Sequence, residues 1–597
     1  MRGWRSTESN IELDLGRYEL RRFGRRVKLE KKPMELLIFL VARREQLVSR
    51  KDIIKKLWRS DLFIDADRNL NNIVRKIRTV LGDDPAKPRF VETVVGKGYR
   101  FVGPLRVVGA QYASPGPGQN PERENTSYRE ERSSLAVLPL LHYGKAADEG
   151  LSLGIADALV SRLGNLDNVD VLPISAVVDL PPDTPAEEVA SRVGVRFVVR
   201  GAIQLAKGQW QLSIELFDAN LRGCSFSRKS ALDLEHLADL ETDIAKQIAG
   251  ALNRPLGTSL SRKHPRFSKD PLAYAEFMRG YRLNASGDPS VQQNAVHHLT
   301  NAVTRDPGFA LAHATLSVTC ATRHFESDPA NVWLEKAEFH CRRALETDPE
   351  LPEGYVARAF LLWGPSKNFQ HIEAIADLKR GLELQKNLPH AYNRLGTILA
   401  HIGQFDHARE MYERGRSFHP QRKISPSIAQ VYVWNQEYEL ARELIRAWRN
   451  ENPGNKYAIY FAPQPALMAD KWDEAELLID EALELMPEES MIISLRGVLY
   501  ALTGKEKEAL ECITKACAIP RSFGHLHHTY YQIACILALL GRAGTAFEWL
   551  ERSVGNGFAC WPLFLKDRCL QNLRGIPEFE LLVSSLQSRF PETLGQL

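Results

Sequence analysis

Residues 67–82 read DRNLNNIVRKIRTVLG, and this stretch decides the fold of the N-terminal part of the chain. At about 100° per residue, a helix with this sequence has one apolar face and one polar, basic face. The apolar face is formed by Leu70, Val74, Ile77 and Leu81. The opposite face carries Arg68, Asn72, Arg75, Lys76 and Thr79, with Arg78 on its flank. The stretch therefore predicts an amphipathic helix that packs on a core and presents cations to solvent.

The basic face has the chemistry of a reader of double-stranded DNA. An α-helix fits the major groove, where Arg or Lys bridges guanine O6 and N7 and Asn pairs with adenine. Arg75, Lys76 and Asn72 supply these groups, and Arg78 on the flank is placed to hold a phosphate. The alternative interpretation is that these charged residues form only a solvated helix face, as most runs of charged residues do. DNA binding is favoured because the cations converge on one face of a basic module.

The residues on either side complete a winged helix-turn-helix. After the helix, residues 90–102 (FVETVVGKGYRFV) predict a hairpin in which Gly96 and Gly98 permit a tight turn and Lys97 stands at the tip. Such a wing enters the minor groove or grips the backbone. Before it, one helix starts at Pro33 and a second follows Ser49, with Asp52 as the capping partner. Residues 11–29 alternate apolar and polar and predict a small antiparallel sheet.

Charge is unevenly distributed along the chain. The 597 residues carry a net charge of +4, yet residues 10–105 contain 23 Lys and Arg against 13 Asp and Glu. The rest of the chain is therefore acidic. A basic module on an acidic body indicates a polyanionic partner for the module alone.

Three motifs in order, VSRKDIIKKLW, DRNLNNIVRKIRTVLGDD and ETVVGKGYRF, make residues 11–103 resemble the OmpR/PhoB-type winged-helix domain of CadC- and ToxR-like transcription regulators. The resemblance implies DNA contacts at Arg68, Arg75, Lys76 and Arg78 in the helix and at Thr93, Lys97 and Tyr99 in the wing. Val95 stands where many members have an arginine, so one phosphate contact is expected to be missing. The family's usual receiver domain and membrane span are not found in this sequence.

Two further domains are predicted. Residues 105–132 are rich in Pro, Gly and charge and predict a flexible linker after a DNA-binding domain at 10–104. Residues 133–256 alternate strands and helices, with a hairpin at Lys207–Gly208, and predict a small α/β domain. The segments SLAVLPL, GIADALVSRL and GVRFVVRGAIQ resemble the TolB amino-terminal-like domain. That resemblance implies binding or assembly and no known chemistry.

Residues 268–597 contain an internal repeat and predict an all-α superhelix of stacked helical hairpins. Alanines recur at intervals of 33 to 42 residues at Ala295, Ala337, Ala374, Ala408, Ala441, Ala475, Ala509 and Ala546. The copy from Tyr392 to Pro420 resembles the tetratricopeptide consensus, with Gly415 in place of the usual alanine. The inner surface of such an array is expected to bind a peptide or protein, with scaffolding or self-association as the alternative.

Signals for an enzyme or a metal are weak. Gly150–Gly154 matches G-x-S-x-G around Ser152, but a loop precedes it where the nucleophile elbow needs a strand, so a helix N-terminus with Gly154 near its cap is the favoured interpretation. His525, His527 and His528 with Cys517 and Cys535 fit no standard metal spacing. No phosphate-binding or dinucleotide motif is present. We therefore expect no catalytic residues, no cofactor and no metal.

Eight cysteines without a C-x-x-C pair, no secretion signal and no apolar run of about 20 residues indicate a soluble cytoplasmic protein without a membrane partner. We expect a one-component, sequence-specific transcription regulator. Its partners would be double-stranded DNA, RNA polymerase or another protein at the repeats, and a second copy in a homodimer. Two alternatives are a repeat scaffold with weak DNA contact and, remotely, a hydrolase using Ser152.

Overall fold

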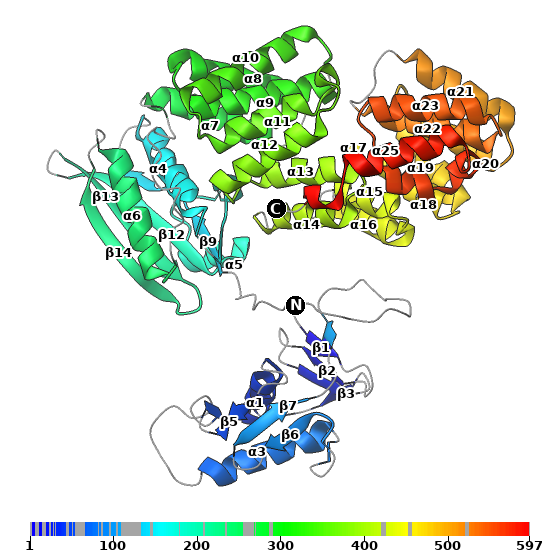
Figure 1. Cartoon of the computed structure of the whole chain (residues 1–597). Coiled ribbons are helices and arrows are strands. Elements are labelled where there is room, and N and C mark those ends of the chain that lie inside the picture. Colours follow the sequence, from blue (N-terminus) through cyan, green and yellow to red (C-terminus); the bar gives the residue numbers. More distant parts are fainter. Residues whose placement is uncertain are drawn as a thin grey trace. The chain divides into compact units, whose positions relative to one another are not determined.

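The computed structural model forms two compact units, Met1–Asn125 and Thr126–Leu597 (Figure 1). The residues that the structure describes are 3–5, 11–14, 19–22, 25–27, 29, 31–42, 47–50, 52–53, 66–81, 83–84, 88–94, 97–102, 106–108, 133–143, 147–166, 168–177, 180–206, 209–232, 236–254, 268, 270–285, 291–326, 328–418, 426–451, 456–519 and 525–595. Every helix among them is too short or too polar to cross a bilayer.

The first unit begins with a five-stranded antiparallel sheet in the order β4-β3-β2-β1-β8. Strands β2 (Ile11–Asp14), β3 (Glu19–Arg22) and β4 (Arg25–Val27) form the small sheet that the alternation over 11–29 predicts. Strands β1 (Gly3–Arg5) and β8 (Arg106–Val108) extend it beyond the predicted 10–104 boundaries. These runs of three residues are too short for a periodic signal, so their pairing could not be read from the sequence.

The winged helix-turn-helix is confirmed as the fold of the rest of this unit. Helix α1 (Lys31–Ala42) starts two residues before Pro33, and α3 (Ala66–Leu81) covers the stretch that was predicted to be amphipathic. Strands β5 (Val48–Ser49), β6 (Val91–Val94) and β7 (Gly98–Phe101) form a sheet in the order β5-β7-β6. The apolar face of α3 lies in the core, where Leu70, Val74, Ile77 and Leu81 are all buried.

The predicted cap of the second helix is also present. The hydroxyl of Ser49 accepts a hydrogen bond from the backbone N–H of Asp52 (3.1 Å) and donates one to its carboxylate (2.7 Å). This exchange satisfies an N–H that the first turn of a helix otherwise leaves unpaired. The rest of the predicted helix, including Ile54, Leu57 and Trp58, lies outside the described residues.

The second unit opens with a sheet in the order β11-β9-β12-β13-β14, with β10 paired to β12. Strands β9, β11 and β12 are parallel, whereas β12, β13 and β14 run antiparallel. Residues 135–137 of β9 are buried without alternation, as expected for a strand between two parallel neighbours. The strands and the associated helices are β9 (Ser133–Val137), β10 (Leu141–Tyr143), β11 (Val169–Val171), β12 (Phe197–Ala206), β13 (Gln209–Asp218), β14 (Gly223–Ala231), α4 (Ala147–Leu163), α5 (Ala186–Val193) and α6 (Leu237–Ala251).

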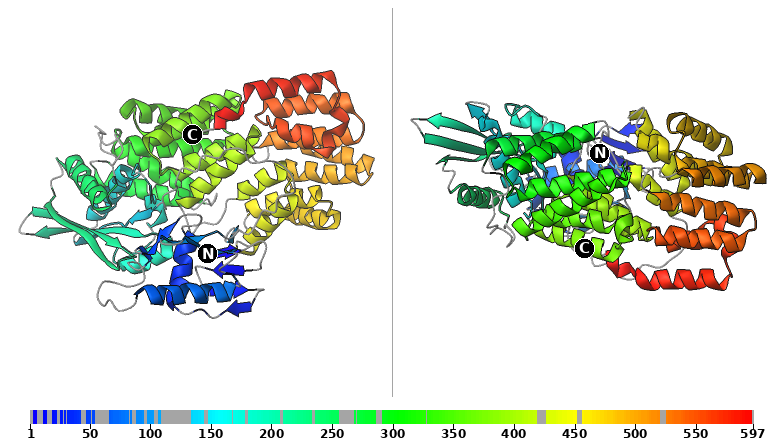
Figure 2. Two further views of the ribbon diagram at one scale, coloured as in Figure 1. Left: turned by 60° about the horizontal axis from the view of Figure 1, so that its bottom comes forward. Right: turned by 90° about the horizontal axis from the view of Figure 1, so that it is seen from above.

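Paired helices follow and lie side by side along the array (Figures 1 and 2). All eight repeat alanines are fully buried, and each lies in the second helix of its pair, from Ala295 in α8 to Ala546 in α23. The helices are α7 (Pro271–Ala285), α8 (Gln292–Arg305), α9 (Ala310–Glu326), α10 (Asn331–Thr347), α11 (Pro352–Leu362), α12 (His371–Leu384), α13 (Pro389–His401), α14 (Phe405–Ser417), α15 (Pro426–Trp434), α16 (Tyr438–Glu451), α17 (Lys456–Phe461), α18 (Pro463–Met468), α19 (Trp472–Leu485), α20 (Ser490–Leu502), α21 (Glu506–Ala518), α22 (Leu526–Leu539), α23 (Ala543–Gly555), α24 (Trp561–Lys566) and α25 (Pro577–Arg589).

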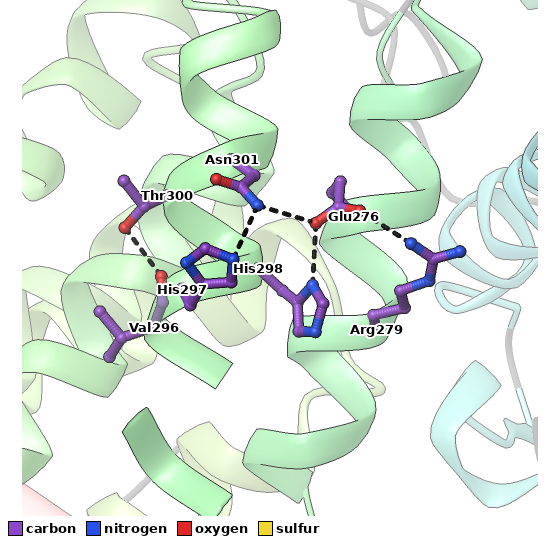
Figure 3. A network of polar contacts seen from close by, with 7 residues as sticks. All are labelled: Glu276, Arg279, Val296, His297, His298, Thr300 and Asn301. Carbon is purple, nitrogen blue, oxygen red and sulfur yellow. Dashed lines mark hydrogen bonds and ion pairs between the residues drawn. The ribbon is translucent and has the colours of Figure 1, made fainter. Parts of the chain in front are cut away.

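A polar network joins the first pair, α7 and α8 (Figure 3). The carboxylate of Glu276 contacts Nδ1 of His298 (2.8 Å) and accepts from the amide of Asn301 (3.2 Å) and from Arg279 (2.8 Å). Burial raises the pKa of Glu276, but the hydrogen bonds from His298 and Asn301 outweigh it and hold this pKa below its usual value. The carboxylate is therefore ionised at neutral pH and holds the two helices in register.

The α/β part and the repeats are packed together within the second unit. Residues of α4 and of the sheet share one continuous apolar core with α7–α11, including Leu159 of α4 and Phe277 of α7. Polar contacts extend this junction to the turn between α12 and α13. Asn165 donates to the carbonyl of Leu384 (2.7 Å) and accepts from the N–H of Lys386 (3.0 Å). The separate 133–256 and 268–597 domains of the sequence analysis stay a prediction, and their described residues lie in one compact unit.

The contacts of Asn165 predict a measurable contribution to stability. Replacement of Asn165 by Ala removes one part-buried and one exposed hydrogen bond to the backbone, and should lower the free energy of unfolding by about 1–2 kcal/mol. Chemical denaturation should show the loss as a lower transition midpoint. Asn294, an exposed asparagine of α8, is the matched control, and its change to Ala is expected to alter the free energy by less than about 0.5 kcal/mol. Equal midpoints for the two variants would contradict this role.

Candidate nucleic-acid interface

The exposed face of α3 carries the central cations of the interface. Arg75, Lys76 and Thr79 are exposed, on the side of the helix away from the buried Val74 and Ile77. Arg68 and Asn72 belong to the same helix, but their side chains lie outside what the structure describes. The structure thus places three of the predicted side chains together on one solvent-facing helix surface.

Arg78 connects this helix to the wing. Its Nη2 donates to the carbonyl of Val91 (2.7 Å) and to the hydroxyl of Thr93 (2.8 Å), both in β6. The side chain is half-buried, and two of the residues predicted to contact DNA, Arg78 and Thr93, therefore contact each other. In this arrangement the guanidinium fixes the spacing between the helix and the hairpin.

Tyr99 lies in a second connection between elements. Its ring is buried, and its hydroxyl donates to Oδ1 of Asn71 in α3 (2.8 Å) and accepts from Nη1 of Arg50 (3.0 Å). Arg50 also donates to Asn71 (3.1 Å), which closes a triangle between the start of the second helix, α3 and β7. Neither Arg50 nor Asn71 was predicted from the sequence to have a role at this site. Their positions inside the motifs VSRKD and DRNLNN were the available signal.

The hairpin requires glycine at position 98. A Cβ there would lie 2.0 Å from the backbone oxygen of Val48, because β5 and β7 pair directly at this point. Lys97 precedes it in the turn with an exposed side chain, and its N–H donates to the carbonyl of Val94 (3.0 Å). Val95 and Gly96 lie outside the described residues. The exposed lysine is thus carried on a turn that close backbone packing holds against β5.

Asp83 organises the connection from α3 to β6. Its buried carboxylate accepts hydrogen bonds from the backbone N–H groups of Arg89 (2.6 Å), Phe90 (3.1 Å) and Val91 (2.8 Å). Three N–H groups that would otherwise be unsatisfied are therefore paired with one anion. This role of Asp83 was not predicted, although Asp83 is the first of the two aspartates that end the motif DRNLNNIVRKIRTVLGDD.

The second unit contains a cavity of about 380 Å³, lined by α4 and by the first helices of successive pairs, α7, α9, α11 and α13. The guanidinium of Arg394 lies at its wall, 3.6 Å from the centre of the Phe360 ring. Burial lowers the pKa of Arg394 to about 10, and its Nε is buried without a hydrogen-bond partner among the described residues. The volume is in the range of small-molecule sites, and Arg394 supplies a positive charge at the wall.

Ser152 does not have the surroundings of a nucleophile. It lies inside α4, five residues after the helix begins at Ala147, and its buried hydroxyl donates to the carbonyl of Leu140. Gly154 lies in the middle of α4, so the expectation that it stands near the cap is wrong. The helix begins earlier than expected, because residues 147–149, which were predicted to be loop, form its first turn together with Gly150.

Comparison with known proteins agrees with this geometry. Residues 24–101 match the family model "Transcriptional regulatory protein, C terminal", and residues 389–415 match a tetratricopeptide repeat. Both are resemblances that the sequence motifs indicated, and they are confirmed. The first match spans the winged-helix elements from β4 to β7, and the second covers α13 and most of α14.

Three relatives illustrate the range of similar proteins. A Rhizobium meliloti protein provisionally named adenylate cyclase 3 is 24% identical over 241 residues, 39% of this chain and 40% of its own. Transcriptional regulatory protein YxdJ of Bacillus subtilis is 36% identical over 93 residues, 16% of this chain and 40% of its own. Transcriptional regulator HilA of Salmonella paratyphi A is 24% identical over 349 residues, 56% of this chain and 57% of its own. The chain thus spans about two fifths to three fifths of these relatives.

The role of Asp83 gives a prediction for the N-terminal unit. Replacement of Asp83 by Ala removes the acceptor for three backbone N–H groups and is expected to lower the free energy of unfolding by about 3 kcal/mol. The neighbouring exposed Asp84 is the control, with an expected loss below about 1 kcal/mol when it is changed to Ala. Urea unfolding followed by Trp fluorescence or circular dichroism measures both. Similar losses for the two variants would remove Asp83 from this role.

Proposed function

We propose that the chain is a one-component transcription regulator whose first unit binds double-stranded DNA sequence-specifically. Helix α3 enters the major groove with Arg75 and Lys76 towards base edges, and Lys97 on the hairpin contacts the backbone or the adjacent minor groove. Arg68, Asn72 and Thr93 complete the contact surface, while Arg78 and Tyr99 position its parts. One observation supports this proposal most directly. Arg75 and Lys76 are exposed on one face of α3, and hydrogen bonds of Arg78 connect this helix to the hairpin that carries the exposed Lys97.

We propose that the second unit receives the signal that controls DNA binding by the first unit. The cavity beside Arg394 suits a small ligand with a hydrogen-bond acceptor, and the repeat helices suit a protein partner such as RNA polymerase or a second copy of the chain. The family match at residues 24–101 and the names of the regulatory relatives support DNA binding by the first unit. We propose no catalytic role for the chain and assign it to the cytoplasm. The competing function is a repeat scaffold that holds DNA weakly and without sequence preference.

The helix contacts are tested with the double variant Arg75→Ala, Lys76→Ala. Each lost bidentate base contact removes about 1–3 kcal/mol of discrimination, so affinity for a selected duplex should fall at least about tenfold. The duplex is obtained by selection from a randomised pool with the full chain, and a scrambled duplex measures sequence preference. The charge-matched control removes Arg192 and Lys246, two exposed cations of the second unit, and should change affinity less than twofold. If the double variant prefers the selected duplex over the scrambled one as strongly as the unmodified chain does, the repeat-scaffold function is supported instead.

The proposed contact of Lys97 predicts a change in the salt dependence of DNA binding. If Lys97 neutralises one phosphate, Lys97→Ala should reduce the slope of log affinity against log salt by about 0.9. The loss should be equal for the selected and the scrambled duplex, because a phosphate carries no sequence information. Fluorescence anisotropy across a salt series provides both values. A slope identical to that of the unmodified chain rules out a phosphate contact at this position.

A further inference from the structure

Four histidines from two distant segments meet inside the second unit. His401 ends α13, whereas His525, His527 and His528 stand at the start of α22. One ring nitrogen of each lies within 4.8 Å of the corresponding nitrogens of the other three. The prediction that no metal binds rested on the three clustered histidines and two cysteines. His401 is more than a hundred residues away in the sequence, so no local pattern includes it.

The hydrogen bonds orient two of these rings as metal ligands are oriented. Nδ1 of His401 lies 2.8 Å from the carbonyl of Thr397, and Nδ1 of His527 lies 2.8 Å from the carbonyl of Asn556. Each Nδ1 must therefore carry the proton, which leaves Nε2 with its lone pair. A ligating histidine almost always donates its other N–H to such an acceptor. Nε2 of His401 is buried and has no hydrogen-bond partner among the described residues.

The separations are close to those of a tetrahedral site. With Zn–N bonds of about 2.0–2.1 Å, neighbouring ligand nitrogens lie about 3.3 Å apart. Nδ1 of His525 and Nε2 of His527 are already separated by 3.1 Å. All four ligand nitrogens lie within 4.8 Å of one another, so they already surround a common point. Four imidazoles with no carboxylate or thiolate match the preference of late first-row divalent ions and not of Mg²⁺ or Ca²⁺.

The surroundings keep the imidazoles in the form that binds metal. Burial, reinforced by the mutual repulsion of the rings, lowers the pKa values of all four histidines well below their usual range. The rings are therefore neutral at physiological pH, and no proton has to be displaced from them. Trp363, Trp434 and Phe558 surround them, with centroids 4.9, 5.1 and 5.8 Å from that of His401. The positive charge of Arg394 opposes an added cation, so affinity should be below that of cysteine-rich sites.

A second group of metal-ligand residues, Cys535, Asp567 and Cys569, has a structural explanation. The carboxylate of Asp567 accepts from the N–H of Cys569 (2.8 Å) and from the hydroxyl of Tyr531, so both of its oxygens have donors. Burial raises the pKa of Cys535 and keeps its thiol protonated. We therefore do not propose a metal site at these three residues, and Cys569 serves as a comparison position in the test below.

We propose that His401, His525, His527 and His528 bind one Zn²⁺ ion in a tetrahedral site. His401 and His527 contribute Nε2, and His525 and His528 complete the coordination. The ion ties the end of α13 to the start of α22 and so fastens the C-terminal repeats to the middle of the array. Nothing in the DNA interface depends on this site.

The proposal is tested on the full, untagged chain after removal of metal with a chelator. Titration with Zn²⁺ should show one equivalent bound, and elemental analysis after dialysis should retain it. Replacement of Zn²⁺ by Co²⁺ should give the intense visible absorption of tetrahedral cobalt. At zinc concentrations about 100-fold above Kd, the thermal midpoint of the second unit should rise by several degrees. Mg²⁺ should do none of this.

The key variants are His401→Asn and His527→Asn, because the Asn amide can keep the hydrogen bond of Nδ1 while Nε2 is removed. Each should weaken Zn²⁺ binding at least about tenfold and reduce the cobalt absorption. The control is His340→Asn, because His340 is a half-buried histidine of α10 that lies outside the cluster. This variant should bind zinc as the unmodified chain does. Should a variant fail to fold, the zinc stoichiometry and cobalt spectrum of the unmodified chain still decide. No bound zinc, or zinc retained in both variants but lost in Cys569→Ala, overturns the proposal.

Discussion

The second unit depends on close approach between paired helices. Ala295, Ala337 and the six alanines at the equivalent positions of later pairs are buried completely, and a larger side chain at any of them would push two backbones apart. Because a single helical hairpin cannot cover its own apolar face, each pair is stable only against its neighbours. The stacking that results also produces the inner surface lined by α7, α9, α11 and α13, where the cavity lies. The regular spacing of small residues is thus the cause of both the architecture and the ligand-sized space.

The first unit is held together by polar contacts between short elements. Its sheets are small, and its core consists mainly of residues from α1, α3 and the hairpin. Arg78 with Thr93, Tyr99 with Asn71, and Asp83 with three N–H groups connect α3 to the strands of the hairpin. These bonds fix the angle between the helix and the wing before any DNA arrives. Such preorganisation reduces the entropy that binding would otherwise cost.

Local periodicity allowed much of the structure to be predicted. The apolar stripe of 67–82 located α3, the repeat alanines located the second helices, and the Ser49–Asp52 pair located a helix start. Interactions between residues far apart in sequence left no such pattern. Arg50 and Asn71 meet at Tyr99, Asn165 meets the turn after α12, and His401 meets α22 only because the chain folds them together. For the same reason the phosphate contact of Arg78 was predicted from the sequence, whereas its hydrogen bonds to Val91 and Thr93 in β6 were not.

The junction between α4 and α7 has a consequence for how the array ends. A solenoid exposes apolar surface at its first repeat unless something polar on the outside covers it. Here Phe277 and its neighbours on α7 are covered by α4, so the α/β sheet acts as the terminal lid of the solenoid. Strand β14 forms one edge of this sheet, and its residues are exposed or half-buried, largely in alternation. The sheet and the first helical pairs therefore belong to a single cooperative folding unit, and neither is expected to be stable when the other is removed.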